Sequence, residues 1–255
     1  MFGCWLVVFI IGLFIGSFLN VLIDRIAREE KFIFGRSHCE SCHHLLSWQD
    51  LVPLFSFLFL NGRCRYCRAK IPLWLPIVEL ATGIIFFLTT WFSWGFSWEL
   101  VFLRLIIASL LLVIFFADLK YCLVYGVIIY PILAIILIYQ FIFHGYWPVL
   151  ANPLLSSLGT GLFFYFLYFF TKKKGLGLGD VQIGLLMGLL LGFPNIIVAL
   201  YLAFLTGALV GIILIIVGRA KLKTAIPFGP FLILATFIAW FIGDQIVKIV
   251  MNHLF

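Results

Sequence analysis

Long apolar segments alternate with short polar ones along the chain, and this pattern predicts most of its architecture. Apolar runs of roughly 18 or more residues are typical of membrane-spanning helices. The sixth segment is short for a full crossing, which favours a tilted or partly re-entrant helix. We therefore predict an all-α polytopic membrane bundle of about eight transmembrane segments. They are expected at residues 4–23, 74–92, 99–117, 123–143, 153–171, 181–193, 195–217 and 227–250.

Composition agrees with a membrane protein, because 65% of the 255 residues are hydrophobic and only 11% are charged. The first segment has no basic residue before it and no small-residue cleavage site after it. We therefore expect it to be a spanning helix and not a cleaved signal. Glycines spaced by four residues predict close helix contacts in two segments. They are Gly12 and Gly16 in the first segment, and Gly184, Gly188 and Gly192 in the sixth.

The basic residues gather on one side of this predicted topology. With the N-terminus outside, the inner loops are 24–73, 118–122, 172–180 and 218–226, which hold eight, one, three and three of the 17 basic residues. The positive-inside rule then predicts these loops to be cytoplasmic. Such a face attracts anionic lipid head groups, so membrane lipids are expected partners. The net charge of +7 is explained by topology, and we expect no nucleic-acid partner.

The long polar loop 24–73 carries two CxxC pairs separated by 21 residues. Two such turns can place four thiolates around one Zn²⁺. Two disulfides or free thiols are the alternatives, and disulfides are disfavoured in the reducing cytoplasm. Four thiolates leave no open coordination position, so the zinc would be structural and would fold a loop too short for its own core. The expected ligands are Cys39, Cys42, Cys64 and Cys67; the nearby His38, His43 and His44 could replace one of them.

Two acids lie at the edges of apolar segments on the predicted inner face. Asp118 follows "LLVIFFA", and Asp180 follows the glycine-rich turn "GLGLG". Ionisable groups placed this way are costly and are usually functional. Paired carboxylates can hydrolyse a peptide without a metal, one taking a proton from water while the other donates to the scissile carbonyl. Gly177 and Gly179 are expected to support this site by allowing backbone conformations and close approaches that a side chain would block.

The chain resembles the type IV prepilin peptidases, which are membrane aspartic proteases with a Gly-x-Gly-Asp motif. The resemblance covers nearly the whole length. Presenilin-like proteases share the Gly-x-Gly-Asp motif but have no zinc loop of this kind. The matching segments are "GSFLNVLIDR" at 16–25, the paired CxxC loop, "PIVELATG" at 76–83, "ADLK" at 117–120, "GLGLGDV" at 175–181 and "IPFGPF" at 226–231.

This resemblance implies an endopeptidase that cleaves the short basic leader from prepilins or pseudopilins at the cytoplasmic membrane face. Its partner would be the substrate helix with its leader, and its location the bacterial inner membrane, multi-pass with the N-terminus outside. Asp118 and Asp180 would be the catalytic pair. Many members also methylate the new N-terminus with S-adenosylmethionine, an activity that here depends on the resemblance alone. The implied regions are a first transmembrane helix at 1–23, a zinc-binding loop domain at 24–73 and a membrane-embedded peptidase domain at 74–255.

The chain departs from the family pattern at two places. Val124 and Tyr125 replace an Ile-Pro pair after the first aspartate, and Gln182 replaces a lysine after the second. Neither departure removes a carboxylate. Glu79 lies inside the second segment, and either a packing role or a role in methylation or substrate placement is open for it. The alternative function is a zinc-stabilised, non-enzymatic scaffold or transporter that uses the two aspartates as cation ligands.

Overall fold

The protein is almost entirely helical. The computed structural model describes residues 2–28, 37–122, 126–144, 147–171, 176–218 and 227–254, and no strand occurs within these ranges. The chain divides into two compact units, Met1–Ala117 and Asp118–Phe255. The helices are α1 (Phe2–Ala27), the 3-10 helix η1 (Trp48–Leu51), α2 (Phe55–Phe59), α3 (Trp74–Phe92), α4 (Trp98–Tyr121), α5 (Gly126–His144), α6 (Trp147–Phe170), α7 (Leu178–Leu191), α8 (Asn195–Ile216) and α9 (Gly229–Leu254).

The prediction of a helical membrane bundle is confirmed. Among the described residues, six helices are long and apolar enough to cross a membrane, namely α1, α3, α4, α6, α8 and α9. The expected fourth and sixth segments form α5 and α7, whose described apolar stretches are shorter. The third helix does not end at Asp118 as the sequence suggested, because α4 continues to Tyr121.

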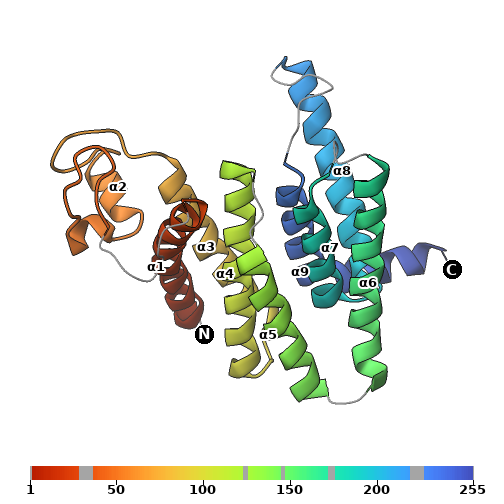
Figure 1. Ribbon diagram of the computed structural model, residues 1–255. Helices are drawn as coiled ribbons and strands as arrows, with labels where there is room; N and C mark the ends of the chain where they lie inside the picture. The colour runs from red at the N-terminus through yellow and green to blue at the C-terminus, as the bar shows by residue number, and fades with distance from the viewer. Residues whose placement is uncertain are drawn as a thin grey trace. The chain divides into compact units, whose positions relative to one another are not determined.

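Within the unit Met1–Ala117, α1 packs along α3 through small residues (Figure 1). A Cβ added to Gly12 would lie 2.8 Å from the Cα of Gly83, and one added to Gly16 would lie 2.7 Å from the Cα of Glu79. Both distances are too short for a side chain, so the close approach predicted for this pair of glycines is present. Asn20 adds a polar tie, donating its Nδ2 to the carbonyl of Leu75 at 3.0 Å.

Within the unit Asp118–Phe255, α7 lies against α6, α5 and α9 (Figure 1). A Cβ on Gly184 would come within 2.5 Å of the Phe164 ring, and one on Gly188 would overlap the α6 backbone. The Thr160 hydroxyl donates to the carbonyl of Gly184 at 2.9 Å. The third glycine of the predicted stripe has another task, because Gly192 ends α7 in a left-handed conformation with φ 64°.

Candidate active site and metal centre

The Gly-x-Gly-Asp sequence forms the beginning of α7. Gly177 precedes the helix, and Asp180 occupies its first turn. The Gly177 N–H donates to the Asp180 carboxylate at 2.9 Å, and the Asp180 N–H donates to the Gly177 carbonyl at 3.2 Å. Because glycine has no side chain, only the carboxylate half of a capping box is present, and it fixes the acid where the helix begins. The Asp180 side chain is held at the mouth of the apolar helix and is only 8% exposed.

Gly177 was expected to adopt a backbone conformation that only glycine allows, but it does not. Its backbone is extended, with φ −89° and ψ 163°, which any residue can adopt. A Cβ there would approach the Asp180 carboxylate no closer than 3.8 Å, an ordinary contact. The contribution of Gly177 to Asp180 is therefore the backbone N–H. Gly179 lies in the first turn of α7, half-buried.

Asp118 is brought to the same place from the end of α4. It is 5% exposed and lies within electrostatic range of Asp180. Gly229, the first residue of α9, makes this possible: a Cβ on it would overlap the Asp118 carboxylate oxygen and lie 3.1 Å from the Cδ1 of Ile183. Ile183 follows Asp180 by one helical turn. Gly229 thus lies between Asp118 and α7, and its missing side chain lets the two elements approach.

Two buried carboxyl groups on separate helices are the arrangement that can share one proton and divide acid and base roles between them. The sequence predicted this pair but missed Gly229. Its motif "IPFGPF" was noted without a structural reason, and only the packing of α9 against α7 supplies one. Of the two departures from the family pattern, Val124 and Tyr125 lie outside the described residues. Gln182 donates its Nε2 to the Tyr130 hydroxyl at 3.2 Å.

The four cysteines of the polar loop converge. Their sulfur atoms all lie within 4.8 Å of one another, and the Sγ atoms of Cys39 and Cys67 are 3.9 Å apart. A tetrahedral Zn²⁺ with bonds of about 2.3 Å requires sulfurs about 3.8 Å apart, whereas a disulfide requires about 2.05 Å. The donor set fits zinc. Within the described chain, the cluster contains the cysteines and none of the three neighbouring histidines.

The loop backbone favours one thiolate before metal binding. The backbone N–H groups of Cys42 and Ser41 lower the pKa of the Cys39 thiol to about 7. Despite the backbone N–H of Ala69, burial and the neighbouring thiols raise the pKa of Cys67 to about 11. With zinc bound, all four thiols would be deprotonated and their pKa values in the free loop would no longer decide their charge.

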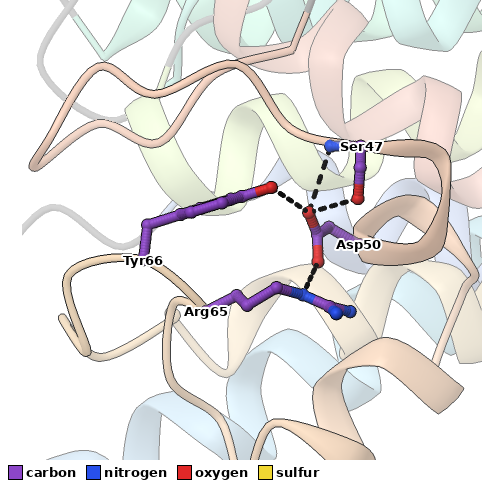
Figure 2. A network of polar contacts seen from close by, with 4 residues as sticks. All are labelled: Ser47, Asp50, Arg65 and Tyr66. Atoms are coloured by element: carbon purple, nitrogen blue, oxygen red, sulfur yellow. Dashed lines mark hydrogen bonds and ion pairs between the residues drawn. The ribbon is translucent and has the colours of Figure 1, made fainter.

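Asp50 joins the two halves of the zinc loop (Figure 2). Its carboxylate accepts from the Ser47 hydroxyl at 2.7 Å, from the Ser47 N–H at 3.0 Å and from Arg65 Nε at 2.7 Å. The Tyr66 hydroxyl lies 3.5 Å from the same group. Burial alone would raise the pKa of Asp50, but the bonds from Ser47 and Arg65 outweigh it and bring the pKa below its ordinary value.

Glu79 connects this loop to the membrane helices. Its Oε2 accepts the backbone N–H of Leu54 at 2.9 Å, and its side chain is buried. Leu54 precedes α2 in a left-handed conformation, with φ 59°. Glu79 therefore holds a strained turn of the loop against the second turn of α3. This contact supports the packing role that the sequence left open.

Comparisons with known proteins agree with this description. Residues 10–93 match the bacterial peptidase A24 N-terminal domain, and residues 105–212 match the type IV leader peptidase family. Three relatives are named prepilin leader peptidase/N-methyltransferase. They come from Pseudomonas aeruginosa (30% identical, covering 94% of this chain and 90% of the relative), Aeromonas salmonicida (31%, 94% and 91%) and Legionella pneumophila (30%, 96% and 94%). No solved structure matches.

The fold and the site define a multi-pass helical membrane peptidase of the aspartic class, with a cysteine-rich loop suited to a structural metal. The chain belongs to the type IV prepilin leader peptidase family. Membership of a peptidase family sets aside the alternative of a non-enzymatic scaffold or transporter.

Proposed function

We propose that Asp118 and Asp180 are the catalytic pair of this peptidase. The observation that carries the proposal is the burial of both carboxyl groups at one place, within electrostatic range and on separate helices. One carboxylate takes a proton from the attacking water, and the other carboxyl group donates a proton to the scissile carbonyl oxygen. When the gem-diol intermediate collapses, the protonated carboxyl group donates its proton to the leaving amine and one diol hydroxyl returns a proton to the other carboxylate, so the pair again holds one shared proton.

The substrate we propose is a prepilin or pseudopilin, in line with the names of the relatives. Its helix would lie mostly in the bilayer and its basic leader in the aqueous layer at the inner face. This requires the N-terminus of the enzyme outside and the loop 24–73 in the cytoplasm, as the distribution of basic residues predicts. The protein would then be a multi-pass protein of the bacterial inner membrane.

Zinc would be held by Cys39, Cys42, Cys64 and Cys67, where it would stabilise the fold of the loop. The proposal that S-adenosylmethionine is a cofactor rests only on the word N-methyltransferase in the relatives' names. The groove of the zinc loop has Gln49, Ser56 and Arg65 as its polar lining and no carboxylate for ribose hydroxyls, so it does not fit this cofactor. No step of the proposed reaction therefore involves S-adenosylmethionine.

Incubation of the purified protein in nanodiscs with a prepilin bearing a basic leader tests the proposal, with the products identified by mass spectrometry. We expect one new N-terminus at the leader junction from the wild-type protein and none from Asp118→Asn or Asp180→Asn. Cleavage by either variant at a substantial fraction of the wild-type rate would exclude the pair as the catalytic groups. Circular dichroism of each variant checks that the helices are intact.

A further inference from the structure

We propose that one face of the zinc loop is seated in the anionic lipid interface of the membrane. This α2 face consists of Trp48, Phe55, Leu58 and Phe59. Three of its members follow the i, i+3, i+4 spacing of one helix side, and Trp48 and Phe59 are 74% and 82% exposed. Such a set of exposed large apolar side chains marks an interaction surface.

The other side of the short helix is directed inward. A Cβ on Gly62 would lie 3.0 Å from the Phe57 ring, so Phe57 packs over the turn that follows α2. Of the three phenylalanines of α2, Phe57 covers this turn, whereas Phe55 and Phe59 are exposed. Trp48, Phe55 and Phe59 themselves line an apolar groove of about 380 Å³, and Arg65 lies at the same groove.

The bond between Leu54 and Glu79 fixes the depth of this face. Glu79 lies five residues into the candidate span that begins at Trp74, which is about 7.5 Å along the helix axis. The polar interface of a bilayer is about 5–7 Å thick on each side. The beginning of α2 therefore lies level with the outer part of α3, at the depth expected of the bilayer interface. Trp and Phe are the side chains that favour this layer.

Charge points to an anionic lipid as the occupant. Exposed cations flank the α2 face in sequence, namely Arg63, Arg65, Arg68 and Lys70. Arg65 uses Nε for Asp50, and Figure 2 shows the remaining nitrogens of its guanidinium group directed away from that carboxylate. Planar guanidinium groups bind phosphate oxygens well, and an anionic membrane surface attracts nearby basic residues. A phospholipid with an acyl chain along the groove and its phosphate near Arg65 would match both the apolar groove and the basic residues.

Fluorescence of Trp48 tests this inference without any need for peptidase activity. The difference in emission between the wild-type protein and Trp48→Phe isolates this one tryptophan, and an exposed residue is removed without loss of packing. The proteins are placed in nanodiscs of phosphatidylglycerol or of phosphatidylcholine, each with lipids brominated near the carbonyl or near the chain end. We expect the Trp48 emission to be blue-shifted, quenched most by bromine near the carbonyl, and quenched more in phosphatidylglycerol.

A second probe guards against a local effect of the Trp48 substitution. In the Trp48→Phe background, Phe59→Trp should be quenched by brominated lipid. Leu45→Trp, at an exposed position of the same loop outside the groove, is the matched control and should not be quenched. An emission maximum typical of a tryptophan in water, with quenching by iodide and not by brominated lipid, would overturn the inference. The α2 face would then be exposed to water and available to bind a peptide. Equal quenching in both lipids would overturn the assignment of an anionic lipid, and quenching of both probes would overturn the assignment of this face.

Discussion

Gly229→Ala should damage the active site far more than the fold. The added methyl group would come about 1 Å inside ordinary contact with the Asp118 carboxylate oxygen, and it would also press on Ile183 at 3.1 Å. Asp118 lies within α4 and residue 229 begins α9, so both backbones are fixed by helical hydrogen bonds. The carboxylate is the part that can move, and we expect it to be displaced by about 1 Å.

The consequences for rate and for stability differ in size. A displacement of about 1 Å at a catalytic group costs on the order of 10²-fold in rate, or about 2.7 kcal/mol of transition-state stabilisation. Overpacking at a buried site typically costs about 1–3 kcal/mol of folding free energy, which a membrane bundle with many other contacts tolerates. We therefore expect a folded protein whose kcat/KM for a prepilin substrate falls about 10²-fold.

Gly159→Ala in α6 is the matched control, because no atom lies within 4 Å of the position its Cβ would occupy. An open helical glycine replaced by alanine should leave the rate unchanged and add up to about 1 kcal/mol of stability. Cleavage kinetics in nanodiscs and thermal unfolding of both variants make the comparison. If Gly229→Ala cleaved within twofold of the wild-type rate, the carboxylate would not be held against Gly229 as we describe.

The remaining predictions concern the two sites. Asp118→Asn and Asp180→Asn should each abolish cleavage in a mass-spectrometric assay. If one variant kept a substantial rate, and that rate survived replacement of the second aspartate as well, the two carboxyl groups would not divide the acid and base roles. Elemental analysis of protein purified without chelator should find one zinc per chain, and replacement of a cysteine ligand should increase amide exchange in the loop; absence of zinc would refute the site. Asp50→Asn should destabilise the loop by about 1–3 kcal/mol at neutral pH, as judged by amide exchange, because a buried acceptor is lost. The lowered pKa of Asp50 means that its contribution is present above the unfolded pKa of about 3.9 and is lost as pH falls through the lower folded value. Glu40→Gln is the comparison, since the exposed ion pair of Glu40 with Arg28 should contribute little to the stability of the loop. If both substitutions increased amide exchange equally, the Asp50 network would not stabilise the loop as we propose.

The sequence predicted the features that depend on local pattern. Helix positions followed from apolar runs, and the cysteine cluster followed from the spacing of two CxxC turns. The predicted segment ended at residue 117, four residues before the end of α4. The helix stops where Cys122 adopts a left-handed backbone conformation, with φ 52°, and the apolar pattern carries no signal for such a stop.

Features that depend on contacts between distant residues could not be predicted in the same way. Leu54 has no sequence mark for a left-handed turn, so its bond to Glu79 was not foreseen. Gly229 is a glycine because of a carboxylate that lies 111 positions earlier in the chain, and periodicity does not report such a neighbour. Gly177 was expected to allow backbone conformations and close approaches that a side chain would block, whereas its described contribution to Asp180 is a backbone N–H. In each case the reason lies in the packing and not in the local pattern.

The two sites are built from different parts of the chain, and this bears on how zinc could affect cleavage. Gly177 and Gly229, the described neighbours of Asp180 and Asp118, belong to the unit Asp118–Phe255, although Asp118 itself is carried by α4, most of which belongs to the other unit. The four cysteines and the network of Asp50 belong to the other unit, where Glu79 bonds the same loop at Leu54. Removal of zinc therefore breaks none of the described contacts of the carboxylates. A loss of cleavage on metal removal would then reflect how the loop meets the membrane or the substrate, and would leave the chemistry of the aspartate pair unchanged.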